Sequence, residues 1–164
     1  MPSFHLQIIS PKRILFEEDV VEITAPTDKG EISILANHTP MVSQLSMGDL
    51  VIKKEKGEQI IAVYGGFINI ESNGTVTILA DNAEHIHEIN EQSAIEAIKK
   101  AEEAIAKAKA SRENFAKGQA ELSHTLFHED HMILAETQAE LLMNLTRLKI
   151  VRKHHQHHGI KYDK

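Results

Sequence analysis

The first part of the chain alternates short apolar runs with turn-forming residues. The apolar runs are of strand length and rich in β-branched residues, at 4–9, 20–23, 32–35, 50–52, 60–64, 67–70 and 76–79. Turn formers lie between them, namely Pro26–Gly30, Asn37–Pro40, Met47–Asp49, Lys56–Gly57, Gly65–Gly66 and Asn73–Gly74. This spacing predicts an antiparallel β-sandwich or barrel. The Asn73–Gly74 pair predicts a two-residue type I′ turn that pairs the run 68–70 with the run 76–78.

The pattern changes at about Ala83 from strand-like to helix-forming sequence. No proline follows residue 90, and one apolar stripe has helical spacing: Ile95, Ile98, Ala101, Ile105 and Ala108. After a predicted break near Gly118, leucine recurs every seven residues at 134, 141 and 148, with Leu145 expected on the same face. The short connection predicts an antiparallel two-helix hairpin. We therefore expect a β domain over residues 1–86 and a helical hairpin over residues 87–164.

Composition narrows the class of protein. The 164 residues carry a net charge of −6, with two Tyr, five Phe and no Trp, which argues against nucleic-acid binding. Cysteine is absent, so the fold needs no disulfide. No apolar run approaches the roughly 20 residues of a membrane span, and the first residues resemble neither a secretory nor a transit segment. The chain is expected to be soluble, with no direct membrane insertion.

Catalytic motifs are not found in the sequence. Gly65–Gly66 is followed by a strand-like run rather than by a helix with Lys-Ser/Thr, so it does not match a phosphate-binding loop. There is no Gly-x-Ser-x-Gly motif and no cysteine nucleophile. The sequence predicts neither an enzyme nor a bound cofactor.

Histidine and basic residues are concentrated in the second half. His124, His128 and His131 fall at i, i+4 and i+7, which makes them weak candidates for a metal site, although solvated surface is the favoured interpretation and no metal is expected. A second cluster, of Arg147, Lys149, Arg152 and Lys153, precedes a histidine-rich tail. These cations either complement a helix C-terminus or form a patch for an acidic partner.

Several collinear segments resemble the epsilon subunit of bacterial F-type ATP synthases. In the β half they are 30–40 (GEISILANHTP), 63–67 (VYGGF) and 76–84 (VTILADNAE), with Ser10–Pro11, Leu15–Phe16, Gly48 and Leu50 also in place. In the helical half, 94–103 is similar to the family's first helix and 139–151 to its second. The resemblance covers nearly the whole chain in the expected order.

The resemblance implies a non-catalytic central-stalk subunit that couples proton flow through the c-ring to ATP synthesis. The implied partners are the gamma subunit, the c-ring and the catalytic alpha and beta subunits. Glu31, Asn37 and His38 are the implied contacts at one end of the sandwich, although Asn37 and His38 could equally serve their own loop. The hairpin is implied to inhibit ATP hydrolysis by bringing the basic cluster 147–153 to acidic loops of the catalytic subunits. The implied location is peripheral, on the cytoplasmic face of the bacterial inner membrane.

The sequence departs from the family pattern at two places. Some relatives bind ATP through an Ile/Leu-Asp-x-x-Arg-Ala motif, but residues 89–94 here are Ile-Asn-Glu-Gln-Ser-Ala, without the carboxylate and the guanidinium. We therefore expect no nucleotide site. The segment containing His124–His131 looks inserted between the two helices, and protonation of its imidazoles could strengthen docking to an acidic partner. A histidine-rich metal-binding protein and a coiled-coil adaptor are the alternative functions.

Overall fold

The computed structural model describes residues 2–116 and 124–157, with side chains described for 2–110 and 134–154. The chain divides into two compact units. The first comprises Met1–Ile89 together with Lys153–Lys164, and the second comprises Asn90–Arg152. The predicted helix break near Gly118 lies outside the described residues.

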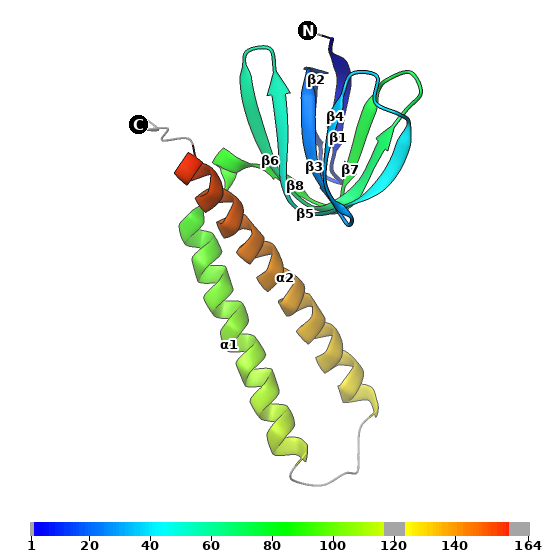
Figure 1. Cartoon of the computed structure of the whole chain (residues 1–164). Coiled ribbons are helices and arrows are strands. Elements are labelled where there is room, and N and C mark those ends of the chain that lie inside the picture. The colour runs from blue at the N-terminus through cyan, green and yellow to red at the C-terminus, as the bar shows by residue number, and fades with distance from the viewer. Residues whose placement is uncertain (1, 117–123, 158–164) are drawn as a thin grey trace. The chain divides into compact units, whose positions relative to one another are not determined.

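The first unit is built on one sheet that folds over its own core (Figure 1). Its strands are β1 (Phe4–Ile9), β2 (Ile14–Val20), β3 (Glu22–Thr27), β4 (Gly30–Leu35), β5 (Met41–Lys54), β6 (Gly57–Ile70), β7 (Val76–Ala80) and β8 (Ala83–His85). Their order is β2-β1-β7-β6-β5-β3-β4, and β8 pairs with β6. Every pairing is antiparallel except that of β1 with β7. The predicted N-terminal antiparallel β fold is confirmed.

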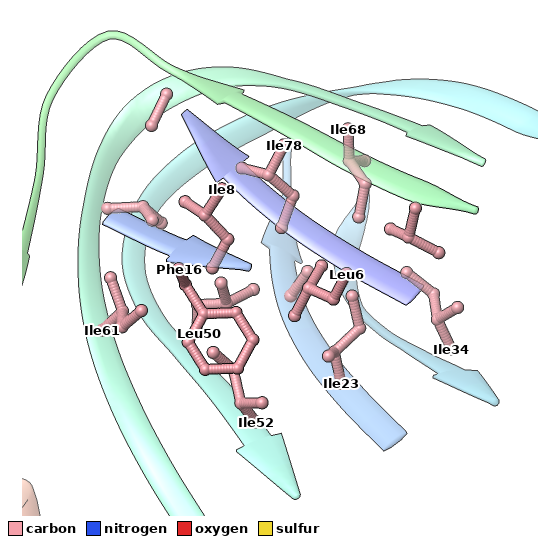
Figure 2. Packing of buried hydrophobic residues seen from close by; sticks show 14 of the residues in the cluster. Leu6, Ile8, Phe16, Ile23, Ile34, Leu50, Ile52, Ile61, Ile68 and Ile78 are labelled. Atoms are coloured by element: carbon pink, nitrogen blue, oxygen red, sulfur yellow. The ribbon is translucent and has the colours of Figure 1, made fainter. Parts of the chain in front are cut away.

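The core of this unit follows from the alternation of apolar side chains along each strand. Figure 2 shows these side chains meeting between the folded halves of the sheet. The fully buried members include Leu6, Ile8, Ile23, Ile34, Leu50, Ile52, Ile61, Ile68 and Ile78. Each such side chain stabilises the folded state by about 1.5–3 kcal/mol relative to an exposed position. The interior is therefore mainly aliphatic, with Phe4 and Phe16 at 7% and 5% exposure as aromatic members.

Two of the predicted turns are wrong, because their glycines lie inside long strands. Gly48 pairs with Val63 in the middle of β5, and Gly66 pairs with Leu45 in the middle of β6. Gly65 and Gly66 have φ of 100° and 122°, which L side chains rarely adopt. Glycine within a strand commonly marks a bend or a close backbone approach rather than a turn. Here it lets β5 and β6 bend, so that each strand contributes to both halves of the core.

The connection at Asn73–Gly74 differs from the predicted type I′ turn. The strands pair as expected, with Ile68 opposite Ile78 and Ile70 opposite Val76. Among these two residues, however, only Gly74 has positive φ, at 88°. Its N–H donates to the Glu71 carbonyl at 3.0 Å. This is the longer hairpin loop in which a type I turn is followed by a left-handed glycine.

A further difference lies between β2 and β3. The run 20–23 was expected to form one strand, but Val20 ends β2 and Glu22 begins β3. The chain bends at Val21, whose N–H donates to the Lys53 carbonyl at 2.9 Å. Most of β2 was therefore missed, because charged residues at 17–19 break its apolar pattern.

The second unit is a hairpin of two helices, α1 (Glu91–Ala116) and α2 (His124–His157, which continues beyond this unit). Figure 1 shows the helices side by side, and the predicted hairpin is confirmed. On α1 the buried residues are Ala94 and Ala101, whereas Ile95 is 38% exposed. On α2 Leu148 is buried as expected, but Leu145 is 46% exposed and Asn144 is buried instead. Leu145 was predicted to lie on the buried face with Leu148, but the preceding residue, Asn144, takes that place.

Asn144 can be buried because its helix satisfies its amide. Its Nδ2 donates to the Glu140 carbonyl at 2.9 Å, and its Oδ1 accepts from Arg147 at 3.0 Å. A buried amide with both ends bonded avoids the cost of an unpaired polar group. A prediction based on apolar spacing alone cannot find such a residue.

Candidate interaction surfaces

The resemblance implies Glu31, Asn37 and His38 as contacts at one end of the sandwich. In the structure they lie at opposite ends of strand β4. Glu31 lies beside the turn between β3 and β4, opposite Pro26. Asn37 and His38 follow the other end of β4, where Leu35 pairs with Glu22. Glu31 lies four residues before the end of β4 at Leu35, and a strand rises about 3.3 Å per residue, so the two sites are separated by roughly 13 Å of strand. The structure does not bring the three residues into one patch.

Asn37 and His38 have roles within their own loop. Asn37 adopts φ of 65°, a left-handed conformation that asparagine tolerates better than most residues. The N–H of His38 donates to the Leu35 carbonyl at 3.1 Å, and its Nδ1 donates to the Thr39 carbonyl at 2.8 Å. These bonds match the alternative in which the loop satisfies its own backbone. Glu31 on β4 and Asn37 in the loop are both exposed, whereas His38 is half-buried.

An apolar row crosses the outer face of the sheet. Ile14 on β2 pairs with Ile9 on β1, Ile9 pairs with Leu79 on β7, and Leu79 pairs with Phe67 on β6. The exposed fractions are 54% for Ile14, 52% for Leu79 and 53% for Phe67, while Ile9 is half-buried. Strands are about 4.8 Å apart, so this outer row of four residues spans roughly 14 Å.

Contiguous exposed apolar surface of this kind marks a site of protein interaction. Val42, 68% exposed on β5, lies two residues from Gln44, which pairs with Phe67 and so extends the row to a fifth strand. Sequence reasoning missed the outer row because its members come from four strands. Only the register places them opposite one another. One signal was available in the sequence. Large apolar residues such as Phe67 and Leu79 occupy strand positions next to the core residues, where an alternating pattern predicts polar side chains.

Beside this face, an open groove of about 640 Å³ lies between the loop before β5 and the loop after β6. Its walls include Met41, Val42, Asn69 and Ile70. Val42 thus borders both the groove and the outer row.

Two of the four residues of the basic cluster at the end of α2, Arg152 and Lys153, contact acidic groups of the same chain. Arg152 Nε donates to Glu91 Oε1 at 3.1 Å within the second unit. Lys153 Nζ and His154 Nε2 lie 2.8 and 2.9 Å from Asp49 Oδ2 within the first unit. Arg147 bonds Asn144, as described above, and Lys149 is exposed.

The Asp49 carboxylate is well shielded from water. Its side chain is 13% exposed, and that of His154 is 10% exposed. Partial burial opposes ionisation of Asp49, but hydrogen bonds from Lys153 and His154 and the charge of Lys153 outweigh it, so the pKa of Asp49 lies below its usual value. The hydrogen bond to Asp49 raises the pKa of Lys153, despite some desolvation. Both groups are therefore charged at neutral pH.

A second polar cluster holds the segment that leads out of the sheet. The short helix η1 (Ile86–Glu88) follows β8, and both Glu88 carboxylate oxygens accept from Arg13 Nη2, at 3.2 and 3.0 Å. The Glu88 carboxylate also accepts from the His85 backbone N–H at 3.4 Å, and Gln59 contacts His85 Nδ1 at 3.1 Å. Partial burial lowers the pKa of His85, which Glu88 only partly offsets. The cluster fixes where the chain leaves the sandwich.

The structure gives Asn90 a role in place of the missing nucleotide motif. Its Oδ1 accepts the Ser93 N–H at 3.0 Å, which is the N-cap bond of α1. The absence of a nucleotide site stays a prediction.

The side chains of His124, His128 and His131 lie outside the described residues, and no cluster suited to a metal is found among those described. Of the helices in the described ranges, neither is long and apolar enough to span a bilayer.

Comparison with known proteins identifies the family in two steps. The family model for the beta-sandwich domain of the ATP synthase delta/epsilon chain matches residues 3–86, which places the β unit in that class. The ATP synthase epsilon chain of Dehalococcoides mccartyi strain BAV1 is 33% identical over 157 residues, covering 96% of this chain and 98% of the relative. That of Dichelobacter nodosus is 42% identical over 103 residues, covering 62% and 71%. The chain therefore belongs to the epsilon-chain family of ATP synthases.

The comparison of folds agrees with this result. A chain of the Euglena gracilis mitochondrial ATP synthase, solved with its F1 portion and c-ring, has a TM-score of 0.64 at 22% identity, covering 89% of this chain and 80% of the other. Family membership confirms the expected non-catalytic rotor subunit of a membrane-associated complex. Neither the metal-binding protein nor the coiled-coil adaptor is supported.

Proposed function

We propose that the outer apolar row binds the gamma subunit and so fixes this chain to the rotor. The observation that carries the proposal is the register, because it aligns Ile14, Leu79 and Phe67 on one exposed face. Burying half of a Leu or Phe side chain stabilises a complex by about 1–1.5 kcal/mol. The row supplies several such contributions side by side, which suits a permanent interface more than a transient one.

The test is binding of gamma by Leu79→Asp. A charge in a desolvated interface should weaken the complex at least about tenfold, and Phe67→Ser should do the same more mildly. The matched control is Leu35→Asp, since Leu35 is 53% exposed on β4 and outside the row. Equal loss of binding in both Asp variants would refute the assignment of this face. Far-UV spectra of both variants confirm that each is folded.

The c-ring contact is proposed at Glu31 and the adjoining β3–β4 turn. Asp28, Lys29 and Gly30 in this turn are exposed, so polar and charged groups surround Glu31. Asn37 and His38 stay proposed contacts, and the bond between His38 and its neighbouring backbone supports their alternative role in shaping the loop. Glu31→Gln should lower ATP-driven proton pumping in the reconstituted enzyme while hydrolysis is retained. Unchanged pumping would exclude Glu31 as a coupling contact.

The hairpin is proposed to inhibit ATP hydrolysis by presenting its basic cluster to the catalytic alpha and beta subunits. The sandwich over residues 1–86 would then bind gamma and the c-ring, and residues 87–164 would regulate ATP hydrolysis. Lys149, Arg152 and Lys153 are exposed, but Arg152 and Lys153 already pair with acidic groups of this chain, so Lys149 is chosen for the test. Lys149→Glu should weaken inhibition of an epsilon-depleted catalytic head, whereas Lys99→Glu, exposed on α1, should not. Equal inhibition by all three chains would remove Lys149 from the contact.

The proposed setting is the cytoplasmic face of a bacterial inner membrane, where the chain is held by its partners. Proton translocation itself is assigned to the c-ring, and this chain transmits its rotation. Membrane association should therefore disappear when gamma and the c-ring are absent, which fractionation of a strain lacking both would show.

A further inference from the structure

Two of the four cations proposed to meet the catalytic subunits, Arg152 and Lys153, already have acidic partners in their own chain. Lys153 and the neighbouring His154 share one oxygen of Asp49, and Arg152 pairs with Glu91. These three groups follow one another at the end of the basic cluster. An acidic partner can bind them only in exchange for the internal carboxylates.

The two internal contacts differ in strength. Arg152 and Glu91 are 59% and 38% exposed, and solvent weakens exposed ion pairs. Asp49 and His154 are nearly buried, at 13% and 10%. A hydrogen bond to an ionised group is stronger than one between neutral groups, and more so where water is excluded. Of these two carboxylates, Asp49 therefore makes the stronger contact with the end of α2.

His154 is held in one orientation by this contact. Because Asp49 is ionised, Nε2 is the donor to it, and Nδ1 is buried without a hydrogen-bond partner in the described part of the chain. Loss of Asp49 would leave both ring nitrogens of a nearly buried imidazole unpaired. Such a group would be expected to move toward water, and the adjoining end of α2 with it.

We propose that Asp49 is an intramolecular competitor that withholds Lys153 and His154 from an acidic protein partner. The proposal rests on the function proposed above, in which that partner is a catalytic subunit. These two basic side chains can bind either Asp49 or the carboxylates of the partner, but not both at once. The balance between them sets how much chain is needed to inhibit hydrolysis, since a fractionally populated competent state weakens apparent affinity in proportion.

The first experiment uses the isolated full-length chain. Asp49→Asn keeps the size of the side chain and removes its charge. Backbone amide exchange over residues 150–154 should rise about tenfold, the loss expected for one hydrogen-bonded charge. Asp28→Asn is the matched control, because Asp28 is exposed in the β3–β4 turn of the same unit. Equal exchange in Asp49→Asn and wild type would overturn the anchoring of these residues by Asp49.

The second experiment measures ATP hydrolysis by an epsilon-depleted catalytic head as each chain is added. Asp49→Asn should inhibit at a concentration about tenfold lower than wild type. In a Lys153→Gln/His154→Gln background the same change should have little effect, because the two basic side chains that Asp49 holds are gone. If Asp49→Asn raises amide exchange but leaves the half-inhibitory concentration unchanged, the competition is overturned. If wild type fails to inhibit, the inhibitory function proposed for the hairpin fails, and the competition fails with it.

Discussion

Replacing Gly66 by alanine should destabilise the sandwich far more than the same change at another glycine with positive φ. An added Cβ would lie 2.1 Å from the Leu79 carbonyl oxygen and 2.8 Å from the Ala80 Cα, so the strands β6 and β7 would have to separate. The φ of 122° costs an L residue roughly 1–2 kcal/mol. Loss of one or two ladder hydrogen bonds adds about 0.5–1.5 kcal/mol each. The expected total is about 3–4 kcal/mol.

Gly74→Ala provides the control. Gly74 has φ of 88°, but nothing lies within 4 Å of its Cβ position, so it should lose about 1 kcal/mol from backbone conformation alone. Urea unfolding can be followed by the fluorescence of Tyr64, which is 5% exposed. With a slope near 1 kcal/mol per M, the midpoint should fall by about 3–4 M for Gly66→Ala and about 1 M for Gly74→Ala. Equal shifts would refute the steric argument.

Three further outcomes are expected. Ala101→Leu should overpack the hairpin and cost about 1–3 kcal/mol in thermal unfolding monitored at 222 nm, whereas Ala104→Leu, at an exposed position, should be near neutral. Arg13→Gln should speed amide exchange at 86–88, because both Glu88 carboxylate oxygens lose the Arg13 Nη2 donor, and unchanged exchange would exclude this restraint. The lowered pKa of Asp49 predicts a stabilising contribution above pH about 4 that is lost as pH falls through its folded pKa, and acid titration of Asp49→Asn should lack this component.

Local pattern was sufficient to predict the aliphatic strands and the two helices, and it failed where long-range pairing decides. Glycine is found both in turns and inside bent strands, and only the pairing of β5 with β6 shows that Gly48 and Gly66 lie inside strands. Asn144 is buried because its amide bonds within its own helix. A prediction that places apolar residues on the buried face therefore chose Leu145 instead. In each case the deciding partner is not readable from apolar spacing.

The candidate surfaces were predictable to different degrees. The basic cluster was visible as a run of cations, but Asp49, about a hundred residues earlier in the chain, was not recognisable as its partner. The outer row required the register of four strands before Ile14, Leu79 and Phe67 became one surface. Resemblance supplied Glu31, Asn37 and His38, and geometry then divided them between the two ends of β4.

The parallel pairing of β1 with β7 has a consequence for how the chain is made. Leu6 aligns with Val76 and Ile9 with Leu79, so after β1 leaves the ribosome it has no partner on this side until some seventy more residues have emerged. The hairpin of β1 and β2 can form early, but the side of β1 facing β7 stays open meanwhile. Closing so long a loop is slow. A nascent chain arrested before β7 should therefore be sensitive to protease and bound by chaperones, and one arrested after the sandwich has emerged should be resistant.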